Sequence, residues 1–123
     1  IEIRPWTEAS EAGDIRQFDV GIMPMPDTPW TRGKCGYKLI QYMACGLPVI
    51  ASPVGVNSLI VEDGINGFLT AETEDWLQAF LSLYENPQLR EQMGARGRRS
   101  VETEYCLKIT APRLASFIKR ISF

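Results

Sequence analysis

Short apolar runs alternate along the chain with segments whose apolar residues recur every three or four positions. The apolar runs predict strands over residues 1–6, 19–25, 47–52 and 67–70. The segments with helical spacing predict helices over residues 8–18, 37–45, 73–85, from 87 onward and about 107–122, with a single turn over 58–61. Strands alternating with helices are typical of a parallel sheet covered by helices, so we expect an α/β fold.

Individual residues indicate where these elements end and which side chains they bury. Gly46 is expected to end the helix over 37–45. Thr73 and Asn86 are expected to cap the next two helices. Residues 26–36 lack periodicity and predict one long loop, and turns at Asp63-Gly64 and Asn66-Gly67 predict positive φ angles. The expected buried residues are Val49, Ile50, Ile22 and Met43 in the core, Ala9, Ala12, Ile15 and Phe18 on the first helix, Trp76, Leu77, Phe80, Leu83 and Tyr84 over 73–85, and Leu114, Phe117, Ile118 and Ile121 on the last helix.

Composition narrows the classes of function. The chain has 123 residues, of which 45% are hydrophobic, and this suits one small globular domain. A net charge of −2 provides no positive field for a phosphate backbone, so nucleic acid is not an expected partner. Histidine is absent, and neither a serine-type triad nor a zinc site is expected within these residues.

Cysteine usage and hydropathy predict the compartment. Cys35, Cys45 and Cys106 form an odd set without paired spacing, which favours free thiols and a cytoplasmic location. No apolar run approaches the roughly 18 residues of a membrane span, and no signal peptide is expected. The chain begins with Ile1 rather than Met, so we expect it to start within a longer protein, whose other parts could place it at a membrane surface.

Two glycine-bearing loops follow predicted strands. Ligands of open α/β sheets lie beyond the carboxyl ends of strands, next to helix N-termini whose free amides attract anions. Residues 33–38 (GKCGYK) supply two glycines and two lysines, and residues 52–57 (SPVGVN) form the second loop. Amides beside a lysine suit a diphosphate. The alternative interpretation is that Lys34 and Lys38 are solvated lysines near a helix end.

Several other residues receive simpler interpretations. Asp27 is expected to be a turn residue, although it could be catalytic. Trp6, Trp30 and Trp76 are expected to pack or to anchor loops, and Trp30, within the long loop, could also touch a ligand. The arginines over 96–99 are expected to be a solvated helix end.

The segment Gly33–Leu69, GKCGYKLIQYMACGLPVIASPVGVNSLIVEDGINGFL, resembles the donor-binding half of the retaining, GT-B-fold glycosyltransferases called group 1 transferases. Its block YMACGLPVIAS, followed by DGINGFL, has the spacing of that family. The resemblance is looser for DVGIMP and for NPQLREQMGARGRRSVETEY. It implies a Rossmann-like parallel sheet with flanking helices over residues 1–123, a partial C-terminal donor-binding domain that lacks the first two strands of that half.

The resemblance also implies a set of site residues. The family frames its donor site with two glutamates, the first touching the sugar and the second the ribose hydroxyls, and by position these fall on Gly33 and Gln41. Gln41 can still bond a ribose hydroxyl, whereas Gly33 has no side chain. Lys38 stands where the family often has proline, and Lys34 or Lys38 is expected to contact phosphate or sugar. The implied substrate-binding residues are Gly33, Lys34, Cys35, Gly36, Tyr37, Lys38 and Gln41, and no catalytic residue is assigned.

The implied activity is retaining transfer of a sugar from a nucleoside diphosphate to an unknown acceptor, without a cofactor. The family's upstream arginine and lysine and its acceptor-binding half have no counterpart in these residues. The N-terminal half of the same protein is therefore an expected partner, and the isolated chain is expected to be inactive. Leu59, where many members have glutamate, weakens the second loop as a site. The alternative is a non-catalytic nucleotide-binding or interaction module that kept the fold and lost the glutamates.

The resemblance has one consequence for the edge of the sheet. It makes Ile1–Trp6 the third strand and Asp19–Met25 the fourth, with the family's first two strands between them. Without those two strands, Asp19–Met25 would have an unpaired edge, which soluble proteins rarely tolerate. We therefore expect that Ile1–Trp6 pairs with Asp19–Met25, or that two copies of the chain meet edge to edge or exchange segments.

Overall fold

A three-stranded parallel sheet lies at the centre of the fold. The computed structural model describes residues 1–121. The strands are β1 (Gly21–Met23), β2 (Val49–Ala51) and β3 (Gly67–Leu69), in the order β1-β2-β3. Each is shorter than the apolar run that predicted it. Gly21 pairs with Val49, and Val49 pairs with Gly67, so the three strands run in register. The α/β class and the parallel sheet are confirmed.

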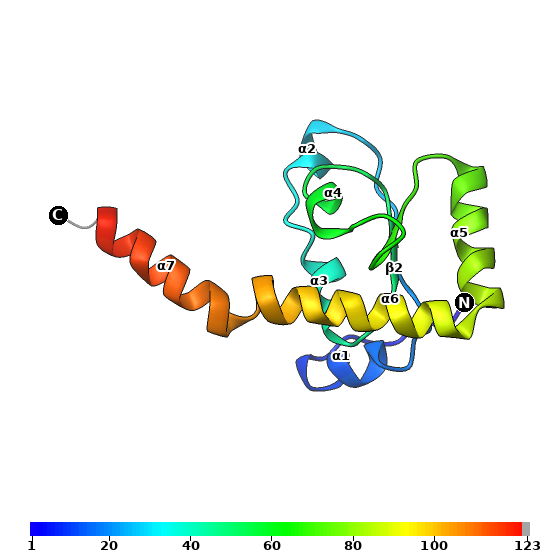
Figure 1. The fold of residues 1–123 in the computed structure, drawn as a ribbon, viewed down its shortest axis with the longest axis horizontal. Coiled ribbons are helices and arrows are strands. Elements are labelled where there is room, and N and C mark those ends of the chain that lie inside the picture. Colours follow the sequence, from blue (N-terminus) through cyan, green and yellow to red (C-terminus); the bar gives the residue numbers. More distant parts are fainter. Residues whose placement is uncertain (122–123) are drawn as a thin grey trace.

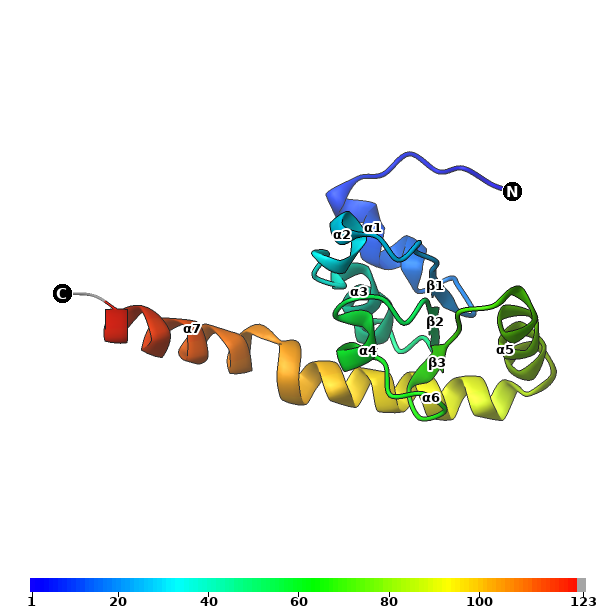
Figure 2. The ribbon, with the colours of Figure 1, turned by 90° about the horizontal axis from the view of Figure 1, so that it is seen from above.

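Helices cover both faces of this sheet (Figures 1 and 2). Their bounds are α1 (Glu8–Ile15), α2 (Pro29–Arg32), α3 (Tyr37–Ala44), α4 (Asn57–Ile60), α5 (Thr73–Glu85), α6 (Pro87–Ser100) and α7 (Leu107–Ile121), with a π-helix, η1 (Val101–Tyr105), between the last two. In Figure 2, α3 and α4 lie on one side of the strands and α5 on the other. The last predicted helix over about 107–122 is therefore confirmed to residue 121, and residue 122 lies outside the described residues.

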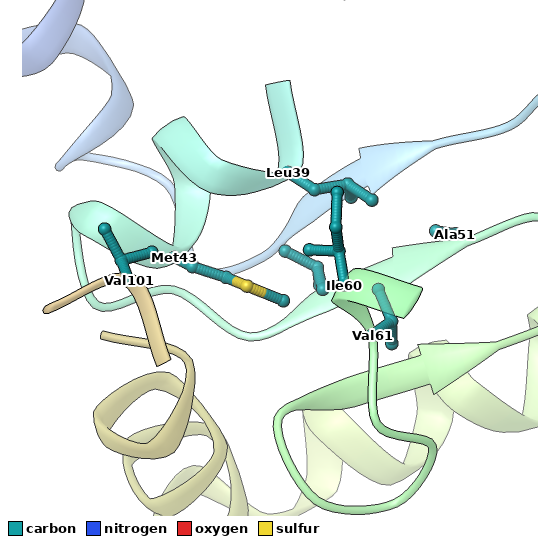
Figure 3. Packing of buried hydrophobic residues seen from close by; sticks show 7 residues of the cluster. Leu39, Met43, Ala51, Ile60, Val61 and Val101 are labelled. Carbon is teal, nitrogen blue, oxygen red and sulfur yellow. The ribbon is translucent and has the colours of Figure 1, made fainter. Parts of the chain in front are cut away.

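Alternation along β2 divides the core into two clusters. Val49 and Ala51 face α3 and α4, and Ile50 faces α5 and α6, because successive strand side chains point to opposite faces. On the first side, Leu39, Met43 and Ile60 point toward one another between α3, α4 and the sheet (Figure 3). On the second side, Ile50 is buried with Ala79, Leu83 and Met93. Both faces of β2 are therefore dry.

The predicted strand over residues 1–6 is wrong. This segment has no regular structure and is exposed, and it does not pair with β1. Arg4 instead bonds Glu2 at 2.7 Å and Asp14 of α1 at 3.3 Å. An alternating run forms a strand only when a neighbouring strand accepts its backbone hydrogen bonds, and no described strand lies beside it. The expectation that Ile1–Trp6 covers the edge of β1 is wrong as well.

The edge position of β1 changes one further expectation. Ile22 was expected in the core, but it is 43% exposed because no described strand or helix covers its side chain fully.

The predicted long loop over 26–36 contains the short helix α2, which begins with a capping box. The hydroxyl of Thr28 accepts from the Thr31 amide at 3.2 Å, and the Thr31 hydroxyl accepts from the Thr28 amide at 3.0 Å. A helix of four residues is too short to show a helical spacing of apolar residues in the sequence, and for this reason it was not predicted.

Turns and caps agree with the sequence in part. Gly64 has a positive φ of 74°, as expected, and Gly46, expected to end its helix, follows α3 with φ 77°. Gly67 has no positive φ and belongs to β3, where the space beside it is filled by Val49. Asn86 caps α6 by accepting from the Leu89 amide at 3.0 Å. The N-cap residue of α5 is Glu72 and not Thr73, because Thr73 already belongs to the helix.

The helical stripes are buried only where another element packs on them. On α1 only Ile15 is buried, Ala9 and Ala12 are exposed, and Phe18 lies beyond the end of the helix and is exposed. On α5, Leu83 is buried and Trp76 partly so, whereas Leu77, Phe80 and Tyr84 are exposed. Helix α7 extends away from the body (Figures 1 and 2), and its whole predicted stripe is exposed. Pro112 lies inside α7.

Candidate functional site

A cleft at the carboxyl end of β1 gathers the predicted site residues. Its volume is about 860 Å³, and it lies between α1, the loop before α3, and α3 itself. All seven residues that the sequence indicated line it, namely Gly33, Lys34, Cys35, Gly36, Tyr37, Lys38 and Gln41. Four further residues complete the wall, namely Trp6, Glu8, Glu11 and Met23. The cleft is therefore built by a segment preceding β1 as well as by the loop that follows it.

The start of α3 provides backbone donors at the cleft. Gly36, the N-cap residue, has φ 66°, and a side chain there would meet Ile60 at 2.5 Å. Only glycine combines this left-handed conformation with so close an approach. The cap makes no side-chain hydrogen bond, and within the described chain the amides of Tyr37 and Lys38 have no acceptor. These amides and the helix dipole favour an anion at this position.

Lys38 is held by an acidic residue of α1. Its Nζ donates to the Glu11 carboxylate at 3.2 Å, and the two side chains are 44% and 23% exposed. The hydrogen bond from Lys38, followed by those from Gln41 and Trp6, lowers the pKa of Glu11. Glu11 is therefore ionised at neutral pH. Lys34 lines the same cleft and forms no ion pair with residues 1–121.

Gln41 lies one helical turn after Lys38 and also faces Glu11. Its Oε1 is buried and accepts no hydrogen bond from the described residues. A buried acceptor without a donor is unfavourable, so a donor that reached this oxygen would stabilise it. The position that the family resemblance assigns to a ribose contact is thus occupied by an acceptor with free capacity.

Glu11 and Trp6 are two of the four wall residues that sequence reasoning did not assign to the site. Both lie before β1, and nothing in the local pattern distinguishes Glu11 from Glu8 as a cleft residue. Trp6, Glu11 and Lys38 also line a second hollow of about 500 Å³. Trp30, which could have touched a ligand, is exposed on α2 and does not line the cleft.

Asp27 has a structural partner. Its two carboxylate oxygens accept from Arg32 at 2.6 and 2.9 Å, in a two-pronged pair across α2. The hydrogen bond to Arg32 lowers the pKa of Asp27. Asp27 lies in the irregular segment between β1 and α2, where the structure has no turn, so the turn interpretation is not confirmed, and the pair with Arg32 braces the short helix.

The second loop, over residues 52–57, is used to hold the fold. The hydroxyl of Ser52 accepts from the Met25 amide at 2.9 Å, which ties this loop to the end of β1. Asn57 is fully buried and donates from Nδ2 to the Ser52 carbonyl at 3.0 Å. Gly55, at φ 56°, packs against the Arg32 backbone. These contacts hold residues 52–57 against the end of β1 and against α2. The second loop therefore has a structural role, and the cleft beside the first loop is the candidate site.

Two other classes of site receive no support from residues 1–121. Their Cys, Asp and Glu side chains nowhere gather in a group of three that could hold a metal ion. None of the helices in this part of the chain is long and apolar enough to cross a membrane.

Sequence comparisons agree with the resemblance. A model of the family described as glycosyl transferases group 1 matches residues 7–86. The chain is 32% identical over 122 residues to D-inositol 3-phosphate glycosyltransferase of Paenarthrobacter aurescens, a match that covers 97% of this chain and 29% of the relative. The chain thus spans less than a third of the length of that relative.

Structural comparisons show the same fold. Sucrose-phosphate synthase from Thermosynechococcus elongatus superposes with a TM-score of 0.75 and 25% identity, over 84% of this chain and 25% of that one. Anabaena HepE in complex with UDP superposes with a TM-score of 0.70 and 19% identity, over 87% of this chain and 29% of that one. The sheet and its flanking helices therefore match part of GT-B glycosyltransferase structures, as predicted.

Proposed function

Because this chain belongs to the group 1 glycosyltransferases, we propose that its cleft binds the nucleoside diphosphate of a sugar donor in a retaining glycosyltransferase. The observation that carries the proposal is the pairing of free amides at the start of α3 with two lysines in one cleft. An extended anion matches this arrangement, because both types of group lower its energy. HepE, which shares the fold, forms complexes with UDP and with UDP-glucose.

The proposed reaction needs a stabilised leaving group. The bond between the sugar carbon and the diphosphate oxygen breaks, a bond to the acceptor oxygen forms on the same face, and the departing phosphate oxygen takes the acceptor proton. The amides of Tyr37 and Lys38, with Lys34 and Lys38, would stabilise the charge that develops on the diphosphate. We propose that these amides and lysines stabilise the leaving group without a bound cofactor.

The cleft differs from the family pattern at the two positions that contact the donor, position 33 for the sugar and position 41 for the ribose. Gly33 lines the cleft without offering a side chain, so a contact to the transferred sugar would come from the backbone or from another part of the protein. Gln41 keeps an acceptor at the ribose position. The absence of a carboxylate at position 33 favours the second candidate, a nucleotide-binding module without transferase activity.

Calorimetric titration of the full-length protein with UDP, GDP, ADP and CDP tests the proposal. One of these is expected to bind. Lys34→Ala or Lys38→Ala is expected to weaken its binding by about 1 to 3 kcal/mol, the value of a charged hydrogen bond. Lys108→Ala, on the exposed face of α7, removes the same charge away from the cleft and is expected to have no effect. Unchanged affinity in both cleft variants would remove the lysines from the site.

Transfer assays separate the enzyme from the binding module. The full-length enzyme is expected to release nucleoside diphosphate from the matching sugar nucleotide when acceptor is present. A module would bind the nucleotide and release nothing. The 123-residue chain by itself is expected to show no turnover, since catalysis requires donor and acceptor held in one geometry and the resemblance places acceptor binding in the other half of the protein.

A further inference from the structure

The cleft contains a carboxylate that does not come from the loop after β1. Glu11 belongs to α1, and its side chain reaches across to α3. At 23% exposure it is the more buried partner of its ion pair. The Lys38 ammonium at 3.2 Å restricts the direction in which the carboxylate can point. A carboxylate fixed by one partner keeps lone pairs for others, because its two oxygens offer about four acceptor positions.

Gln41 supplies a second acceptor beside this carboxylate. Its side chain faces Glu11, and both residues line the cleft. The buried Oε1 of Gln41 has no donor among the described residues. A ligand that placed hydroxyl donors here would satisfy this oxygen, and a hydroxyl bonded to the Glu11 carboxylate would form a charge-assisted hydrogen bond.

The residue types at positions 11 and 41 are complementary. A glutamate at position 41 would place a second negative charge against Glu11, and like charges on facing helices repel. Glutamine removes that repulsion, donates toward Glu11 and keeps one acceptor. Lys38 neutralises the charge that remains. Together the three residues hold one carboxylate at the contact of α1 with α3.

We propose that Glu11 is a specificity-determining residue whose carboxylate, together with Gln41 Oε1, binds the two ribose hydroxyls of the nucleotide. This inference rests on the proposed function. One hydroxyl donates to Glu11 and the neighbouring hydroxyl donates to Gln41. The carboxylate that the resemblance would place at position 41 is in this protein contributed by α1.

The test compares ribonucleotides with their 2′,3′-dideoxy counterparts in the full-length protein. The tightest binder among UDP, GDP, ADP and CDP is titrated beside its dideoxy form. The unchanged protein is expected to prefer the ribonucleotide by about tenfold or more, as charged hydrogen bonds allow. Glu11→Gln keeps the side-chain size and is expected to reduce this preference to less than about threefold, with the affinity for the dideoxy form unchanged. Glu91→Gln, at an exposed position of α6 outside the cleft, removes the same charge and is the matched control, which is expected to keep the preference.

Three results would overturn the inference. Glu11→Gln could retain the full preference for the ribonucleotide, which would show that the carboxylate does not meet the hydroxyls. It could weaken both ligands equally, which would show that Glu11 only holds α1 against α3. It could tighten both, which would show that Glu11 only competes with the diphosphate for Lys38. If the unchanged protein binds none of the four nucleotides, the proposed function fails, and this inference fails with it.

Discussion

Single residues set the shape of the loop that precedes α3. Gly36 has a left-handed backbone, and Ile60 and Val56 lie where a side chain would be. At this position the loop therefore presents backbone amides, and no side chain, beside the start of α3. The consequence of adding one methyl group differs between this glycine and Gly13, which has open space around it.

Gly36→Ala is expected to lower the free energy of unfolding by about 1 to 3 kcal/mol, because alanine is strained at this φ and crowds Ile60. Gly13→Ala is the matched control. Gly13 is helical and has open space around it, so alanine is expected to raise the free energy of unfolding by about 0.5 to 1 kcal/mol. Urea denaturation measures both. Equal stability of the two variants would show that the loop accommodates a side chain at position 36.

At the scale of elements, similar apolar stripes have different surroundings. Helix α5 contacts α6, and α6 contacts α3 and β3, so the inner sides of α5 and α6 join the core. Arg90 of α6 strengthens this junction by donating to the Leu83 carbonyl at the end of α5, at 2.5 Å. Arg98, expected as part of a solvated helix end, donates to the carbonyl of Ala44 in α3. Helix α7 contacts η1 and exposes its own stripe.

Truncating one leucine in each helix tests this difference. Leu83→Ala is expected to lower the free energy of unfolding by about 2 to 5 kcal/mol, because it leaves a cavity beside Ile50 and Met93. Leu114→Ala, at a residue that is 60% exposed, is expected to change it by no more than about 0.5 kcal/mol. Chemical denaturation of the 123-residue chain monitored by circular dichroism provides the measurement. A large loss for Leu114→Ala would mean that α7 is packed in solution.

At the scale of the whole molecule, the open edge of β1 is the main unsatisfied feature. No described strand pairs with its outer side, and Ile22 is partly exposed there. An apolar sheet edge is a template for another strand. A second copy of the chain, or another part of a longer protein, could supply that strand, and the mass of the chain in solution distinguishes the two.

The 123-residue chain is expected to associate with itself through this edge. Ile22→Lys is expected to lower the average mass measured by sedimentation equilibrium, because a charge on an edge strand opposes pairing. Ile65→Lys is the control, since Ile65 is similarly exposed but lies in the turn before β3. A chain that sediments as a monomer before any substitution would contradict the expectation of edge pairing.

Much of the fold could be predicted from the sequence because its signals are local. Apolar runs, Asn86-Pro87 and Gly46 determine where strands and helices form, and the glycines and lysines of 33–38 indicate the loop of the candidate site. Tertiary structure decided what each element meets. Residues 1–6 alternate like a strand but have no described partner, and α7 has an apolar stripe but no described element over it. Glu11 enters the cleft only because α1 packs beside α3, at a separation of 27 residues from Lys38. Pairing, burial and ion pairs depend on distant parts of the chain, so these features could not be derived from local pattern.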